Sequence, residues 1–249
     1  MKYFLHLAYD GTRYAGWQMQ PNARTVQAEL DRALSLVLRQ AVHVQGSGRT
    51  DAGVHASQQV AHFEADVPEN LPLARLLYRL RRALPPDIAP LRLHPVPDEA
   101  HARFSAEART YEYFVLTAPD PFRREFAFFI DRPLDVVAMN EAAAHLVGSF
   151  DFTTFSKVKG AETHYICVCY EAGWHPAPGG LVFRIRANRF VRGMVRLVVG
   201  TLLDVGRDRL APAAFRALLL AQNRVAAGSA APAHGLYLSR VEYEAGLVP

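Results

Sequence analysis

The alternation of strand-like and helix-like segments most constrains what this chain can fold into. The first half is expected to contain strands at 3–10, 41–48, 57–65 and 88–97 and helices at 25–40 and 73–84. The first helix has an apolar stripe at helical spacing, with Thr25 as its N-cap. The second helix stops at Pro85-Pro86, because proline cannot continue a helix.

The second half repeats this rhythm loosely. It is expected to contain strands at 109–117, 164–174, 180–188 and 235–244 and helices at 135–148, 190–205 and 212–222. Asp135 is a plausible N-cap for its helix, and Pro212 suits the first helical turn. The pattern predicts an α+β fold of two lobes, each an antiparallel sheet covered by helices, with a cleft between them. The lobes are expected at 1–104 and 105–249, with the division near 103–109.

The preference for arginine over lysine bears on the class of binding partner. The net charge is only +4, but just three of the 28 basic residues are lysines. Guanidinium groups suit bidentate contacts with phosphate and stacking on bases, so a nucleic-acid partner is plausible. Ordinary solvated surfaces built from arginine explain the composition equally well.

Several classes of protein are disfavoured. The chain shows neither a signal-peptide pattern nor an apolar run long enough for a membrane helix, so a cytoplasmic protein without membrane contact is expected. Cys167 and Cys169 are too few for a disulfide framework or a four-cysteine zinc site. The sequence contains no Walker A, HExxH or GxSxG motif, and no metal or cofactor is expected.

The stretch "GSGRTDAGVHA" at 46–56 surrounds one aspartate with small residues. Glycines permit a tight, closely approached backbone, and the small flanks leave room beside Asp51. An aspartate in such a turn often does no more than cap backbone N–H groups, and Asp10 in "YDGT" is interpreted as a turn former of this kind. A carboxylate without an acidic partner also suits attack at a sugar C1′ or addition to an electron-poor ring.

Two later segments could complete a site around this carboxylate. Tyr111 and Tyr113 share a strand face near arginines, an arrangement that can stack an unpaired base, although ordinary sheet tyrosines look the same. Arg196 lies in an otherwise apolar helical segment, one turn after Arg192. If it is buried it needs an anionic partner, for which Asp51 is the obvious candidate; if it reaches solvent it needs none.

Together, these motifs resemble a known family. The segments "GRTDAGVHA", "HARFSA", "ARTYEY", "DFTTFSK", "NRFVRGMVRLVVG" and "HGLYL" occur in this order over nearly the whole chain. They closely resemble the tRNA pseudouridine synthase A family. The resemblance implies isomerisation of uridine to pseudouridine at positions 38, 39 and 40 of the tRNA anticodon stem-loop, without cofactor. It also implies a homodimer and two RNA-recognition-like lobes whose sheets join into one, with helices on the outer face and a basic cleft.

The resemblance assigns roles by motif position. Asp51 corresponds to the nucleophile, Tyr111 to the residue that stacks on the uracil and assists proton transfer, and Arg196 to the partner of Asp51. The implied substrate-binding residues are Tyr111, Arg49, Leu236, His55, Arg103 and Arg192. One segment departs from the family: "KVKGAETHYICV" carries His164 where an arginine is common, and Lys157 and Lys159 are expected to supply the charge instead.

Two other functions fit part of the sequence. A non-catalytic tRNA-binding module would use the same basic cleft without chemistry. A nucleoside glycosylase would release uracil, but the sequence offers no second functional carboxylate beside Asp51.

Overall fold

The computed structural model describes residues 1–157 and 164–247. The chain divides into two compact units, Met1–Glu107 with Tyr237–Pro249, and Ala108–Leu236. The first unit therefore includes the end of the chain, which sequence analysis assigned to the second lobe. The reason is a long-range pairing, because Tyr237 and Leu238 run parallel to His55 and Ala56.

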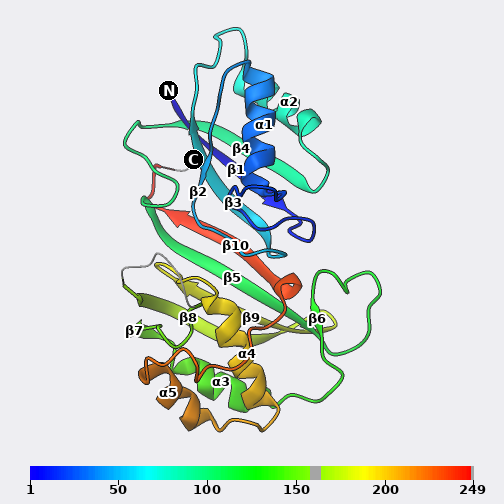
Figure 1. The fold of residues 1–249 in the computed structure, drawn as a ribbon, viewed down its shortest axis with the longest axis vertical. Helices are drawn as coiled ribbons and strands as arrows, with labels where there is room; N and C mark the ends of the chain where they lie inside the picture. The colour runs from blue at the N-terminus through cyan, green and yellow to red at the C-terminus, as the bar shows by residue number, and fades with distance from the viewer. Residues whose placement is uncertain (158–163, 248–249) are drawn as a thin grey trace. The chain divides into compact units, whose positions relative to one another are not determined.

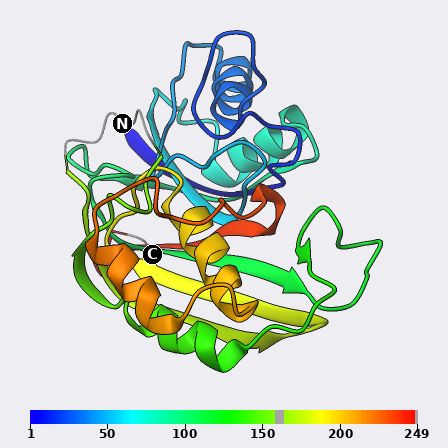
Figure 2. The same cartoon turned by 60° about the horizontal axis from the view of Figure 1, so that its bottom comes forward.

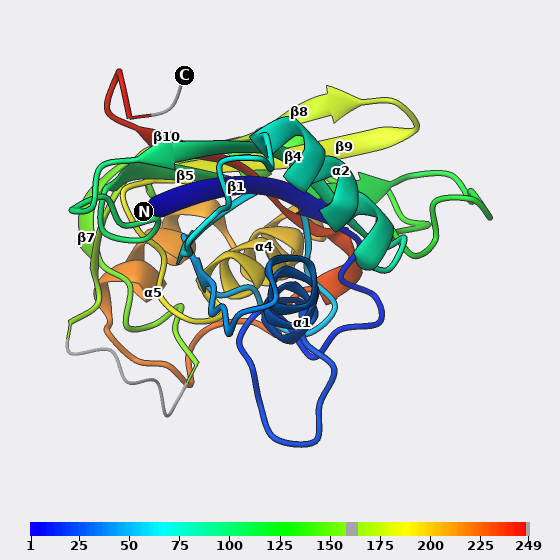
Figure 3. The same ribbon diagram turned by 90° about the horizontal axis from the view of Figure 1, so that it is seen from above.

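The first unit is a sheet of five strands with two helices (Figure 1). Its strands lie in the order β4 (Ile88–Val96), β1 (Lys2–Tyr9), β3 (His55–Glu64) and β10 (Leu236–Tyr243), and the two-residue β2 (Gln45–Gly46) pairs with β3. Strand β1 is antiparallel to both of its neighbours. Helix α1 (Val26–Leu38) lies on one face of the sheet, and α2 (Leu73–Ala83) packs against α1 and β4 (Figures 1 and 3).

The second unit is a sheet with three α-helices, antiparallel except for the short β6, which runs parallel to β5. Its strands lie in the order β5 (Ala106–Leu116), β9 (Gly180–Ala187), β8 (Ile166–Ala177) and β7 (Gly148–Asp151), and β6 (Phe128–Phe129) pairs with β5. Helices α3 (Val136–Ala144), α4 (Met194–Gly206) and α5 (Pro212–Leu220) cover one face of this sheet (Figure 2). A 3₁₀ turn, η1 (Ala233–Gly235), precedes β10.

Local sequence signals are confirmed at several element ends. The Thr25 hydroxyl accepts a hydrogen bond from Ala28 N–H at the start of α1, and Asp135 does the same for Ala138 N–H at the start of α3. Pro212 opens α5. In β9, Phe183, Ile185 and Ala187 are fully buried, as the alternating pattern predicts.

One predicted helix begins later than expected. The helix expected from residue 190 starts at Met194, because Gly193 before it has a φ of +75°, in the left-handed region. Arg192 therefore lies in a turn and not on the helix, and the expected spacing of one helical turn between Arg192 and Arg196 is wrong.

The α+β fold class is confirmed, with ten strands and five α-helices among the described residues. How the two sheets are joined and whether a basic cleft lies between the lobes remain predictions.

Candidate active site

Asp51 lies in the loop between β2 and β3, in the first unit. The loop leaves β2 at Gly46 and returns through a turn in which Val54 N–H donates to the Asp51 carbonyl at 3.1 Å. Asp51 is half-buried, and Arg49 is exposed. A side chain at Gly48 would meet no atom within 4 Å, so there is open space directly before these two residues.

Residues 9–17, which comprise the last residue of β1 and the turn after it, hold this loop in place and are called the bracing segment here. Trp17 N–H donates to the Thr50 carbonyl at 3.2 Å, and Gly53 N–H donates to the Tyr14 carbonyl at 3.2 Å. The hydroxyls of Tyr9 and Thr50 are 2.8 Å apart, one donating to the other, in a buried position. The backbone around Asp51 is thus fixed on both sides, which favours a defined orientation of its carboxylate.

A glycine makes this bracing possible. Gly16 has a φ of +96°, and a Cβ there would lie 2.6 Å from the Thr50 carbonyl oxygen. Only glycine tolerates both the left-handed backbone and the close approach. The sequence shows Gly16 plainly, but only the fold reveals that it faces the Asp51 loop.

Asp10 and His55 form a second brace at the base of the loop. Asp10 accepts from Thr12 N–H at 2.9 Å, which confirms it as a turn former. Its Oδ1 also lies 3.1 Å from His55 Nδ1, which accepts a hydrogen bond from Gly11 N–H at 3.0 Å. Burial raises the pKa of the Asp10 carboxyl, but hydrogen bonds from Thr12 and the nearby His55 outweigh it, so the net pKa lies below its ordinary value.

His55 itself is buried, with 1% of its surface exposed, and its ring stacks on Tyr237 at 4.7 Å between centroids. These contacts place His55 as a support for the start of β3.

Arg103 lies on the surface of the first unit beside an aromatic pair. Its guanidinium is 5.6 Å from the centre of the Phe104 ring, which is 77% exposed. Phe104 in turn contacts His101, with ring centroids 4.4 Å apart. An exposed ring next to a cation is a suitable surface for an RNA base.

In the second unit, the two tyrosines of β5 differ sharply. Tyr113 is fully buried, and its hydroxyl donates to the Pro232 carbonyl at 2.9 Å. Burial raises the pKa of Tyr113 well above its ordinary value. Tyr111 is half-buried, and its ring meets Phe190 edge-on at 5.0 Å. Of the pair, Tyr111 therefore suits stacking on a base, and Tyr113 belongs to the core.

Arg196 occupies the first turn of α4 and is half-buried. Its Nε donates to the Ala231 carbonyl at 2.7 Å, and Ala231 N–H donates back to the Arg196 carbonyl at 2.9 Å. This reciprocal pair ties both the backbone and the guanidinium group of Arg196 to the backbone of Ala231. Carbonyl acceptors of this kind carry no signature in the sequence, so the contact could not be predicted.

Leu236 is 5% exposed at the start of β10, directly after η1. The preceding Gly235 lies against Tyr113, because a Cβ at Gly235 would sit 2.7 Å from that ring. Leu236 is therefore held by a tightly packed turn.

The basic residues of the segment before α4 are also placed. Arg192 is exposed, and its carbonyl accepts from Lys157 N–H at 2.9 Å. An Arg189 amino group lies 2.8 Å from His164 Nε2. Lys159 lies outside the described residues.

The proposed residues thus form two sets. Arg49, Asp51, His55 and Arg103 belong to the first unit, and Tyr111, Arg192, Arg196 and Leu236 to the second. That the two sets form one site remains a prediction. Among the described residues, the structure holds no cluster of three or more histidine, cysteine, aspartate or glutamate side chains suited to a metal ion.

Comparison with known proteins identifies the family. The family model described as "tRNA pseudouridine synthase" matches residues 6–105 and 142–244. A protein of Bacteroides thetaiotaomicron named tRNA pseudouridine synthase A is 49% identical over 246 residues, covering 97% of this chain and 90% of its own length. The chain belongs to the tRNA pseudouridine synthase A family. It is therefore an isomerase, a tRNA pseudouridine synthase.

More distant members of the tRNA pseudouridine synthase A family match over the same extent. The Bacillus subtilis protein of that name is 43% identical, covering 96% of this chain and 97% of its own length. A chain from "Crystal Structure of a Cbf5-Nop10-Gar1 Complex" is 11% identical with a TM-score of 0.35, covering 94% of this chain and 57% of that one, a similarity too low to support an argument. None of the described helices is long and apolar enough to cross a membrane.

Proposed function

We propose that this synthase converts uridine to pseudouridine at positions 38, 39 and 40 of the tRNA anticodon stem-loop, with Asp51 as the catalytic carboxylate and without a cofactor. The observation that carries the proposal is the Asp51 loop. Asp51 is half-buried, backbone hydrogen bonds fix the loop on both sides of it, and open space lies at Gly48 of the same loop, within the part of the chain that the family model matches.

The reaction sets clear demands on the site. The bond between C1′ and N1 of uridine breaks, the uracil turns, and C5 joins C1′; C5 loses its proton and N1 gains one. Asp51 attacks C1′, adds to C6 of the ring or removes a ribose proton, and each route needs its ionised form. Arg196, as the partner of Asp51, would favour that form.

The target base must also leave its stack, at a free-energy cost of a few kcal/mol. Tyr111 offers a half-buried ring that would recover part of this cost by stacking on the uracil. The exposed Arg49 would hold the flipped nucleotide, and the buried Leu236 would line the uracil pocket and keep water from C1′. His55 acts as a positioning residue, and Arg103 and Arg192 supply exposed guanidinium groups for the RNA backbone. The enzyme would work as a homodimer in the cytoplasm, as the family resemblance implies.

The decisive experiment follows the proton lost from C5. Transfer RNA carrying tritium at uridine C5 should release label to water, and Asp51→Asn should reduce release more than about 1,000-fold. Because the substitution replaces one oxygen by an amide of the same shape, the unfolding temperature and tRNA binding should stay close to those of the wild type. An active Asp51→Asn variant would refute the role of Asp51.

The two alternatives predict other products. A binding module would bind tRNA in a salt-sensitive way and release no label from any tRNA. A glycosylase would produce free uracil, which chromatography separates from pseudouridine. Mapping pseudouridine in treated tRNA then tests positions 38, 39 and 40 directly.

A further inference from the structure

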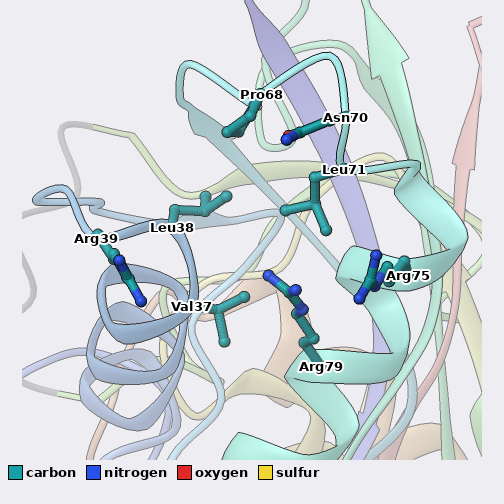
Figure 4. A pocket seen from close by; sticks show the side chains of 8 residues that line it. All are labelled: Val37, Leu38, Arg39, Pro68, Asn70, Leu71, Arg75 and Arg79. Atoms are coloured by element: carbon teal, nitrogen blue, oxygen red, sulfur yellow. The ribbon is translucent and has the colours of Figure 1, made fainter.

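A basic pocket lies in the first unit, between the end of α1 and the start of α2 (Figure 4). It encloses about 270 Å³ and is lined by Val37, Leu38, Arg39, Pro68, Asn70, Leu71, Arg75 and Arg79. Leu38 and Leu71 are buried and form an apolar floor, whereas Arg39, Arg75 and Arg79 are exposed. The lining therefore combines three cations with one neutral amide and includes no acid.

These three arginines differ from most others on α1 and α2. Arg24 and Arg32, near the start of α1, both pair with Glu29, at 2.9 and 2.8 Å. Arg81 donates to the Pro90 carbonyl at 3.1 Å. For the side chains of Arg39, Arg75 and Arg79, no hydrogen bond or ion pair occurs within the described residues. Like charges gathered in a concavity without an anion repel one another, so the arrangement favours an anionic ligand.

Backbone geometry adds to this preference. Arg75 and Arg79 are one turn apart on α2, so both side chains leave the same face. Arg79 extends from α2 toward α1 (Figure 4). The N-cap of α2 is Pro72, which supplies no side-chain acceptor, and Arg75 lies in the first turn, so the partial positive charge of the helix N-terminus lies at the end of α2 that carries Arg75.

The pocket is distant from the Asp51 loop. The start of α1 contacts the bracing segment, because Val26 and Gln27 donate to the carbonyls of Gly16 and Trp17. The pocket lies at the other end of this 13-residue helix. At 1.5 Å per residue, the two ends of α1 are about 18 Å apart. An RNA that reaches both places must extend several nucleotides beyond the target uridine.

We propose that this pocket binds a backbone phosphate of the tRNA, several nucleotides from the modified uridine. Arg75 and Arg79 bind the phosphate oxygens as guanidinium forks, and Arg39 closes the third side. This proposal rests on the proposed function for its choice of RNA, since a free phosphate ion has the same chemistry.

The test compares arginines on one helix. Arg75→Gln/Arg79→Gln should weaken binding of full-length tRNA about tenfold and reduce the slope of log K against log salt by one to two. The loss should appear in Kd and KM. Arg82→Gln is the matched control, because Arg82 is exposed on α2 but does not line the pocket, and its affinity should stay within twofold of the wild type.

Several results would overturn the proposal. The first is an unchanged tRNA affinity in the double variant. The second is a loss of affinity in Arg82→Gln as large as the loss per arginine in the double variant. The third is a double variant in which only kcat falls. Inorganic phosphate provides the second arm: tight phosphate binding that requires Arg75 and Arg79 and does not compete with tRNA would assign the pocket to a free anion.

Binding is measured without turnover, so this test is independent of the reaction. If the wild type made no pseudouridine but bound tRNA through Arg75 and Arg79, the proposed function would fail and the pocket would stand. Circular dichroism and the unfolding temperature of each variant confirm that it is folded.

Discussion

Four histidines are buried in the unit that carries the Asp51 loop: His6, His55, His62 and His94. In the other unit, no histidine within the described residues is buried, and the core is made of side chains such as Phe152, Phe155 and Phe183. Burial lowers the pKa of both His6 and His62 to about 4, and neighbouring positive or histidine groups act in the same direction. Both units have a closely packed apolar core, but among the described residues only the first also buries imidazoles, which stay neutral there.

Acid should therefore destabilise the first unit more than the second, whereas a cavity in the second unit should destabilise it equally at neutral and mildly acidic pH. The chain offers a probe for each, because its two tryptophans, Trp17 and Trp174, are buried in different units. Trp174→Phe leaves Trp17 to report on the first unit, and Trp17→Phe leaves Trp174 to report on the second.

The largest effect is expected from acid on the first unit. The folded pKa of about 4 lies below the ordinary 6.5, so the unfolded state binds the proton more readily. The stabilisation is complete above pH 6.5 and is lost as the pH falls toward 4. Acidification from pH 7 to 4.5 should lower the free energy of unfolding by about 5 kcal/mol through His6 and His62 together.

Urea unfolding of the two single-tryptophan variants measures this. The midpoint reported by Trp17 should fall far more on acidification than the one reported by Trp174. His6→Gln should remove about 2 kcal/mol of the pH dependence. Equal shifts of the urea midpoint for both tryptophans would mean that the buried histidines do not make the first unit more sensitive to acid than the second.

The next effect tests the apolar core. Phe183→Ala should destabilise the second unit by about 3–5 kcal/mol, because the ring is fully buried and leaves a cavity. The loss should be the same at pH 7 and at pH 5.5, unlike the histidine effect, and should be read from Trp174 emission in urea. A loss that depends on pH over this range would contradict the apolar account of this core.

The smallest effect concerns the loop brace. Thr50→Val keeps the shape of the side chain but removes the hydroxyl 2.8 Å from the Tyr9 hydroxyl. Stability should fall by about 1 kcal/mol, and tritium release by about tenfold, because the backbone beside Asp51 is less firmly held. Thr50→Ser retains the hydroxyl and should preserve the rate. Equal rates for Thr50→Val and Thr50→Ser would show that this contact does not orient Asp51.

Local signals in the sequence predicted local structure well. The caps at Thr25 and Asp135 and the buried alternation in β9 need only neighbouring residues for their explanation. Two elements differ from the prediction. Helix α4 starts late because of the backbone of Gly193, whose positive φ the apolar pattern conceals, and the strand expected at 41–48 is reduced to Gln45–Gly46.

Long-range contacts could not be predicted from such local signals. The pairing of β10 with β3, the bracing of Thr50 by Trp17 and the hold of Ala231 on Arg196 join residues far apart in the sequence. In the last two the acceptor is a backbone carbonyl, which every residue possesses. The sequence therefore predicted candidate residues such as Asp51 and Tyr111, whereas the groups that hold Asp51 and Arg196 in place became visible only in the fold.

The place of β10 in the first unit has a consequence for synthesis. Translation produces β1, β3 and β4 before β10, the strand that pairs with the His55–Ala56 end of β3. All of Ala108–Leu236, the second compact unit, is translated in between. A nascent chain that lacks β10 thus carries Asp51 close to the His55–Ala56 end of β3 without the partner strand of that end, and the stacking of Tyr237 on His55 forms only after Tyr237 has left the ribosome.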